Sequence, residues 1–224
     1  MTTAVGVVVF PGTNCEYDAA TALAGCGADV RYVWHHETQL HDLDAVVLPG
    51  GFAHGDYVRP GAIARFSPVM AAVTEFASAG GAVLGICNGF QVLCEAGLLP
   101  GALQKNVGLT FLCRPVELEV TSTRSVLTHA AAPGRRLRIP INHFQGAYVC
   151  DEPTLARLRD EDRVVLRYVE NPNGSIDGIA GIANEHGNVV GLMPHPERAS
   201  DPLLGSADGL VLLEGLLAAV AATV

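Results

Sequence analysis

The sequence predicts an α/β protein with three layers: helices flank a mostly parallel central sheet, and a smaller antiparallel elaboration fills the second half. Two observations predict it. In the first hundred residues, short continuous apolar runs alternate with segments of helical composition, the order typical of right-handed βαβ units. After Gly101 the pattern changes to alternating apolar and charged residues, which is typical of half-exposed strands.

Three apolar runs in the first half, at 5–10, 45–48 and 82–86, have the length and continuity of buried parallel strands, and Asp29 to Trp34 is a further candidate strand. Each is bounded by Gly, Pro or polar clusters, which commonly mark turns. We therefore predict strands at 5–10, 29–34, 45–48 and 82–86, and helices at 16–24, within 61–79 as one or two pieces, and from Asn88 onward. In such sheets, ligand sites lie off the carboxyl ends of the strands.

The second half predicts shorter elements. Val116, Leu118 and Val120 alternate with polar residues, which indicates a strand with one exposed face. Further strands are expected near 136–139, 146–150 and 163–169, a hairpin at 179–183 and 189–193, a short helix after Pro153, and a closing amphipathic helix at 210–220. No internal repeat or linker interrupts this order, so we expect one domain, residues 1–224.

Charge and composition argue against several classes of partner. The net charge of −9 disfavours nucleic acid and anionic membranes. Every apolar run is interrupted before membrane-spanning length, and the first residues lack the basic region of a signal peptide. The six cysteines form no Cys-x-x-Cys pair, which favours free thiols in a reducing compartment. We therefore expect a cytoplasmic protein without a metal site.

A predicted strand–turn–helix junction at residues 85–89, Gly-Ile-Cys-Asn-Gly, carries the strongest chemical signal. Gly-x-Cys-x-Gly is the thiol counterpart of the elbow that presents a nucleophile between a strand and a helix. Its glycines allow a sharp turn because they have no Cβ, and a helix start favours the thiolate form of Cys87. The alternative is a cysteine buried in a core strand, where free cysteine is common.

A second signal is Met-Pro-His-Pro-Glu-Arg at residues 193–198. Pro196 favours an extended backbone at His195, and residues two apart in an extended segment project to the same side. Glu197 can then fix the tautomer of His195 and stabilise its imidazolium form. An ordinary surface pair has the same pattern. Combined with a thiol elbow, however, it gives the nucleophile, base and orienting carboxylate of acyl transfer.

A third signal is Pro-Gly-Gly-Phe at residues 49–52, directly after a predicted strand. Gly-Gly is common in tight turns, yet it also leaves backbone N–H groups uncovered, as an oxyanion hole requires. We predict oxyanion donors at the N–H of Gly51 and at the N–H of Asn88, the residue after the nucleophile.

Together these motifs resemble the class I glutamine amidotransferases, which use a Cys–His–Glu triad on a flavodoxin-like fold. Narrower segments resemble the amidotransferase subunits of phosphoribosylformylglycinamidine synthase, a purine-pathway enzyme. They are Phe-Pro-Gly-Thr-Asn-Cys at 10–15, Gly-Asp-Tyr at 55–57, Gly-Ala-Ile-Ala-Arg at 61–65, Asn-Pro-Asn-Gly-Ser at 171–175, and the run at 191–199. The likeness extends from Phe10 to about Gly209. It departs at Pro60 and at residues 142–146, Asn-His-Phe-Gln-Gly; these departures bear on the details of partner contacts, and we expect neither to touch the triad.

The resemblance implies a glutaminase. Cys87 would attack the side-chain amide of L-glutamine, His195 would protonate the departing ammonia and then activate water, and Glu197 would orient His195. Phe52 and Gln91 would contact the substrate, although Gln91 also fits an ordinary polar position in a helix. The ammonia would pass to a separate synthetase subunit carrying ATP and magnesium. The resemblance also implies a small third subunit, and it implies no cofactor in this chain.

Two other functions remain open from the sequence. The same triad fits a free-standing hydrolase of γ-glutamyl compounds, which would act without a partner. A binding subunit with a vestigial site would be expected to lack Cys87 or His195, so the complete triad argues against it. The remaining candidates have no assigned chemistry: packing is expected for Cys15 and Cys94, an interface for His143, and no ligand-like spacing is found for His35, His36 and His41.

Overall fold

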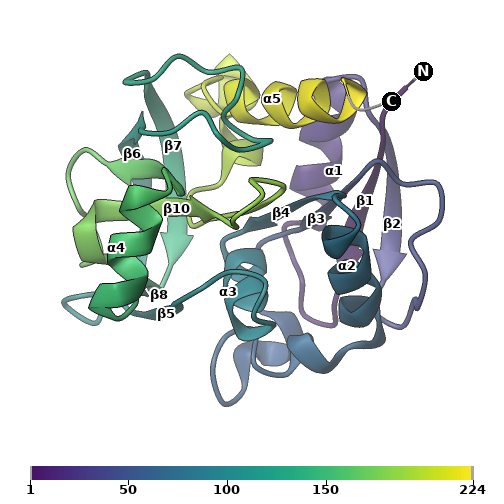
Figure 1. The fold of residues 1–224 in the computed structure, drawn as a ribbon, viewed down its shortest axis with the longest axis horizontal. Coiled ribbons are helices and arrows are strands. Elements are labelled where there is room, and N and C mark those ends of the chain that lie inside the picture. The colour runs from purple at the N-terminus through teal and green to yellow at the C-terminus, as the bar shows by residue number, and fades with distance from the viewer. Residues whose placement is uncertain (1, 223–224) are drawn as a thin grey trace.

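The computed structural model describes residues 2–222, and its centre is a nine-stranded mixed sheet (Figure 1). The strand order is β2-β1-β3-β4-β11-β10-β9-β6-β7. Neighbours from β2 to β11 pair in parallel, and those from β11 to β7 pair antiparallel. The order β2-β1-β3-β4 is that of flavodoxin-like sheets. The predicted α/β fold with a parallel core is therefore confirmed, and the antiparallel strands extend the same sheet.

Four strands of the parallel half are almost fully buried. β1 (Ala4–Val9), β3 (Ala45–Leu48), β4 (Ala82–Ile86) and β11 (Val189–Leu192) are buried almost throughout, as continuous apolar sequences predict. β2 (Asp29–Trp34) is the edge strand and exposes most of its side chains. The predicted bounds of β2, β3 and β4 agree with those in the structure.

Helices cover both faces of the parallel half (Figure 1). α1 (Glu16–Gly25) and α5 (Leu210–Ala221) lie on one face, and α2 (Pro68–Ser78) and α3 (Asn88–Glu95) lie on the other. Short 3-10 turns complete the chain: η1 (Ala53–Asp56), η2 (Ala64–Phe66), η3 (Ile176–Gly178), η4 (Pro196–Ala199) and η5 (Pro202–Leu204). The segment predicted as one or two helices within 61–79 is thus two pieces. No helix among residues 2–222 is long and apolar enough to cross a membrane.

The antiparallel half contains the predicted hairpin and several differences from the prediction. β10 (Ile179–Ala183) pairs with β11, which confirms the hairpin. β6 is Leu112–Val120, β7 is Arg136–His143, β9 is Val164–Tyr168, and α4 is Glu152–Asp160. β7 runs four residues past its predicted end because the ladder continues through Pro140, which faces Pro115 of β6. Because proline donates no ladder hydrogen bond, its place in the sequence suggested the end of a strand.

A separate two-stranded sheet was not predicted. β5 (Ala102–Lys105) pairs with β8 (Gln145–Val149). β5 has only four residues, most of them exposed, so it lacks the apolar run that marks a strand. Its partner β8 follows β7 after one residue, so this small sheet holds the end of β7 near the carboxyl edge of the parallel strands.

Candidate active site

Cys87 lies at a sharp junction between β4 and α3, where the sequence predicts an elbow. Its backbone has φ 51° and ψ −104°, a combination that L-residues rarely adopt. Gly89 permits the close approach of α3 to the sheet, because a Cβ there would lie 1.9 Å from the carbonyl oxygen of Leu48. Neither glycine of the motif has a positive φ. The glycines therefore supply space, while Cys87 itself adopts the strained conformation.

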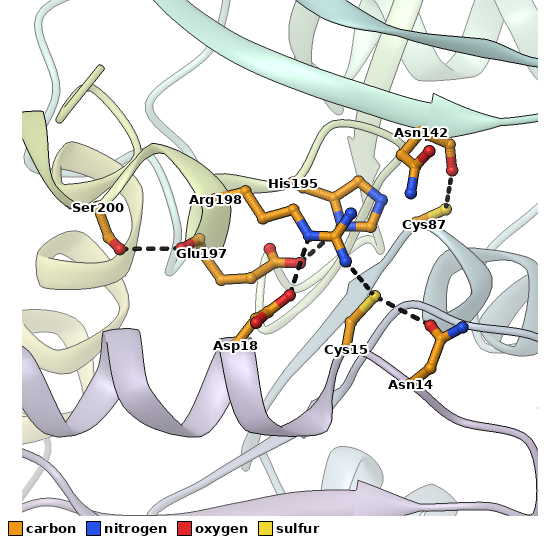
Figure 2. Close-up of polar contacts among 9 residues, drawn as sticks. All are labelled: Asn14, Cys15, Asp18, Cys87, Asn142, His195, Glu197, Arg198 and Ser200. Atoms are coloured by element: carbon orange, nitrogen blue, oxygen red, sulfur yellow. Dashed lines mark hydrogen bonds and ion pairs between the residues drawn. The ribbon is translucent and has the colours of Figure 1, made fainter. Parts of the chain in front are cut away.

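His195 and Glu197 form a buried pair after β11. His195 has an extended backbone (φ −105°, ψ 88°), and its N–H donates to the carbonyl oxygen of Pro140 at 2.8 Å. Nδ1 of His195 lies 2.6 Å from Oε1 of Glu197, and the two residues are only 1% and 3% exposed (Figure 2). Burial lowers the pKa of His195, but the charges of Glu197 and Cys87 outweigh it and raise the pKa well above 6.5.

The ring of His195 also adjoins Cys87. Gly50 lies between the two side chains. A Cβ built on it would be 2.7 Å from Cε1 of His195 and 3.5 Å from Cβ of Cys87, so the space between them at this point is little larger than one methyl group. Figure 2 shows the sulfur on the side of the ring opposite Glu197. The thiol of Cys87 donates to the carbonyl oxygen of Asn142 at 3.7 Å, and Nε2 of His195 is buried with no hydrogen-bond partner in the described part of the chain.

A second buried thiol belongs to the site. Cys15 precedes α1, and its sulfur donates to Oδ1 of Asn14 and accepts from Nη2 of Arg198, both at 3.3 Å (Figure 2). Its sulfur, a nitrogen of His195 and a carboxylate oxygen of Glu197 lie within 4.8 Å of one another. Cys15 was expected only to pack in the core, but it lies beside His195 and Glu197.

These three donors are of the types that bind zinc. Two ligands of one tetrahedral zinc ion, each about 2.1 Å from the metal, are about 3.4 Å apart. The 2.6 Å separation between His195 and Glu197 is shorter than this and is that of a strong hydrogen bond. The geometry of the cluster therefore fits a hydrogen-bonded pair better than a metal centre.

The residues surround a pocket of about 430 Å³. It is lined by Asn14, Cys15, Gly51, Phe52, Asp56, Pro60, Cys87, Gln91, Phe111, Asn142, His143, Phe144, Gln145, His195 and Arg198. Of the predicted site residues, Gly51, Phe52, Cys87, Gln91 and His195 line it, whereas Asn88 and Glu197 lie behind its wall.

Neither predicted oxyanion donor has an acceptor within residues 2–222. The N–H of Phe52 donates to the carbonyl oxygen of Gly12, and the N–H of Cys15 donates to the carbonyl oxygen of Gly50. These bonds join the loop after β3 to the loop after β1 through the neighbours of Gly51. The N–H of Gly51 itself has no acceptor among the described residues. The N–H of Asn88, in the first turn of α3, also has no acceptor among the described residues. Free donors beside a nucleophile are what oxyanion stabilisation needs.

Gln91 takes part in a network within the protein. Its Oε1 accepts from Nδ2 of Asn88 at 2.8 Å, and its Nε2 donates to the carbonyl oxygen of Gln145 at 2.6 Å. Oδ1 of Asn88 accepts from the N–H of Ala53 at 3.0 Å, and its Nδ2 also donates to Oδ1 of Asp56 at 3.0 Å. Gln91 therefore shapes the pocket wall with both ends of its amide engaged.

The expectation that residues 142–146 do not touch the triad is wrong. Asn142 accepts the Cys87 thiol, Gln145 anchors Gln91, and His143 lines the same pocket. His143 is buried against Oδ1 of Asn106, 3.1 Å from its Nδ1, and burial together with the charge of His195 lowers its pKa to about 4. The interface role expected for it does not fit this burial. The cause is tertiary: the carboxyl end of β7 lies over that of β4, which a local pattern does not reveal.

Comparison with known proteins agrees with this arrangement. The family described as CobB/CobQ-like glutamine amidotransferase domain matches residues 2–207. The phosphoribosylformylglycinamidine synthase subunit PurQ of Rubrobacter xylanophilus is 59% identical over 214 residues, covering 96% of this chain and 97% of that protein. PurQ of Nostoc sp. is 57% identical over 219 residues, covering 97% and 98%.

A solved structure gives the same result. A chain in the structure of PurLQS from Thermotoga maritima superposes with a TM-score of 0.90 at 43% identity, over 97% of this chain and 99% of that chain. This chain therefore belongs to the CobB/CobQ-like glutamine amidotransferase family and, within it, to the PurQ subunits of phosphoribosylformylglycinamidine synthase.

Proposed function

We propose that this chain is a glutaminase, a single domain over residues 1–224 that hydrolyses L-glutamine to L-glutamate and ammonia through Cys87, His195 and Glu197. One observation carries the proposal. His195 binds Glu197 through Nδ1 and keeps Nε2 free at the pocket that Cys87 also lines. This is the order of groups that a thiol nucleophile, its base and an orienting carboxylate require.

In the first half-reaction, Sγ of Cys87 attacks the side-chain amide carbon of glutamine, and the thiol proton passes to Nε2 of His195. The N–H groups of Gly51 and Asn88 stabilise the negative oxygen of the tetrahedral intermediate. His195 then returns the proton to the amide nitrogen. Ammonia leaves, and a γ-glutamyl thioester remains on Cys87.

In the second half-reaction, His195 takes a proton from water, and the hydroxide adds to the thioester carbonyl. The intermediate collapses to L-glutamate, and Cys87 leaves as a thiolate that recovers its proton from His195. An imidazolium forms in both halves, and the Glu197 carboxylate stabilises it each time. Phe52, half-exposed at the pocket, and Gln91 in its wall would contact the substrate.

The ammonia needs a destination. In water at neutral pH it becomes ammonium and is no longer nucleophilic, so a glutaminase that feeds a synthesis needs a docked partner. A relative of solved structure is a chain in the structure of PurLQS from Thermotoga maritima, and the curated relatives named above are phosphoribosylformylglycinamidine synthase subunits. The proposal therefore extends to a cytoplasmic complex that serves purine biosynthesis. Its synthetase subunit would bind ATP and magnesium, a small third subunit would be present, and this chain would bind no cofactor.

The test compares glutamine hydrolysis and product synthesis with and without a cognate synthetase. Cys87→Ala should abolish glutamine-supported synthesis in the complex but keep synthesis from added ammonia. Cys15→Ala is the matched control, because it removes the other thiol of the same pocket, and it should keep glutamine-supported synthesis and alkylation of Cys87 by a glutamine-like chloroketone.

Each contrary outcome has a defined meaning. Loss of both activities in Cys87→Ala would make Cys87 structural. If Cys15→Ala abolished glutamine-supported synthesis and Cys87→Ala kept it, Cys15 would be identified as the nucleophile. Hydrolysis that no synthetase stimulates would favour the free-standing hydrolase.

A further inference from the structure

The pocket holds one carboxylate and one guanidinium group among its described lining residues, and the proposed chemistry uses neither. They belong to Asp56 and Arg198. Arg198 is already engaged: its Nε donates to Asp18 at 3.0 Å and its Nη2 to the sulfur of Cys15 at 3.3 Å. Asp56 has no such cationic partner among residues 2–222, because only Asn88 and the backbone of Gly61 bond its carboxylate. It is therefore an uncompensated negative charge in the wall of the pocket.

The carboxylate of Asp56 is held firmly. Its backbone has φ 52°, in the left-handed region, within a loop that also contains left-handed His54 and Val58. Nδ2 of Asn88 donates to its Oδ1 at 3.0 Å, and Asn88 is itself fixed by Ala53 and Gln91. Because Asn88 directly follows Cys87, a single hydrogen bond connects Asp56 to the elbow that presents the nucleophile.

The fold does not require a charge at this position. An asparagine would accept the same hydrogen bond from Asn88 and tolerates left-handed backbone at least as well as aspartate. The carboxylate is in fact unfavourable there, since burial raises the pKa of Asp56 to about 6 despite the bonds from Asn88 and Gly61. A half-buried charge without a partner is a natural site for a cation that comes from outside the chain.

Building on the proposed glutaminase activity, we propose that Asp56 binds the α-ammonium group of L-glutamine and so determines specificity for an α-amino acid amide. In extended glutamine, four bonds and about 5 Å separate the α-nitrogen from the amide carbon that Cys87 would attack. The carboxylate of Asp56 lines the same pocket as Cys87 and is hydrogen-bonded to Asn88, the residue after it, so it is available to recognise that end of the substrate. Asp56 touches the substrate away from the reacting atoms, so its contribution is to recognition.

The test uses L-glutamine and glutaramate, the same amide without the α-amino group, in the complex with the cognate synthetase. Asp56→Asn should lower kcat/KM for glutamine by about 10- to 100-fold, mainly through KM, because a charge-assisted hydrogen bond is lost. It should leave kcat/KM for glutaramate near the wild-type value, so the preference for glutamine falls by the same factor. Asp42→Asn is the matched control, an exposed aspartate with φ 56° outside the pocket, and it should keep the wild-type preference.

An equal loss for both amides in Asp56→Asn would overturn the proposal and leave Asp56 with a structural role only. So would an unchanged preference. The rate of Cys87 alkylation by neutral chloroacetamide separates these cases from a damaged elbow, since it should match the wild type in Asp56→Asn. Failure of the glutaminase proposal is distinguishable, because the wild-type complex would then hydrolyse neither amide.

Discussion

Oε1 of Glu197 lies 2.6 Å from Nδ1 of His195, and both side chains are sealed from solvent. The carboxylate therefore fixes which ring nitrogen carries the proton and leaves Nε2 directed away from it. Burial alone would disfavour the imidazolium, and the charge of Glu197 is the largest of the contributions that raise the pKa of His195 against it.

Glu197→Gln should reduce glutamine turnover by roughly 100-fold, because the neutral amide no longer stabilises the imidazolium. The pKa of His195 should fall, since its largest stabilising charge is removed. Steady-state kinetics and an NMR titration of the ring would measure both effects. Alkylation of Cys87 by a small electrophile should persist. Wild-type turnover in this variant would remove Glu197 from the mechanism.

Gly50→Ala should abolish glutaminase activity without unfolding the chain. The added Cβ would lie 2.7 Å from Cε1 of His195, so the ring must move, and a displacement of about 1 Å costs roughly 100-fold in rate. Gly25→Ala is the control: nothing lies within 4 Å of its added Cβ at the end of α1, and stability should rise by about 0.5–1 kcal/mol. An active Gly50→Ala variant would show that His195 does not need this position.

Gly89→Ala should instead destabilise the fold. Its Cβ would lie 1.9 Å from the carbonyl oxygen of Leu48, so α3 must move away from β3. We expect a loss of about 2–3 kcal/mol in the free energy of unfolding, measured by urea denaturation. Stability equal to that of the wild type would mean that α3 can shift freely, and the elbow would then not be rigid.

Asp56→Asn should change the pH dependence of stability. The pKa of Asp56 is about 6 in the folded chain and 3.8 ordinarily, so between those values the folded chain binds more protons than the unfolded chain. The contribution of Asp56 to stability therefore falls as pH rises through this window and stays unfavourable above it. Removing the charge should stabilise the chain at pH 7.5 by about 1 kcal/mol, after discounting for solvent screening.

At pH 4 this difference from the wild type should be only a small part of that at pH 7.5, because the carboxyl group is then almost fully protonated in the folded chain and about half protonated in the unfolded chain. Thermal unfolding of both proteins at the two pH values would measure it. His143, His195 and Arg198 face the same pocket in both proteins, so their contributions to the pH dependence of stability largely cancel in the difference. A variant less stable than the wild type at pH 7.5 would contradict the expectation.

The sequence predicted the parallel half of the fold accurately because each buried strand there is a continuous apolar run that ends at Gly, Pro or a polar cluster. β3 and β4 are examples, with predicted and observed bounds in agreement. β5 was not predicted because its four residues, most of them exposed, show no alternation of apolar and polar side chains. β7 was predicted too short because Pro140 resembles a strand end.

The residues of the pocket that the sequence did not identify come from segments joined only by the tertiary fold. Asn142 and His143 arrive from β7, whose end lies over the carboxyl edge of the parallel strands. Cys15 arrives from the start of α1. Asp56 had one local signal, a charged residue within a Gly-rich loop after β3. Which neighbours such a residue meets depends on chain packing, and spacing in one sequence does not encode it.

The backbone of Cys87, with φ 51°, has a consequence for how this protein can change over time. A glycine in its place would relax a conformation that costs about 1–3 kcal/mol in other residues. Selection for stability alone would therefore tend to replace Cys87 with glycine. Retention of cysteine at this position in a related chain would therefore indicate continued selection for the chemistry of the thiol. A glycine there would indicate that this selection has ended.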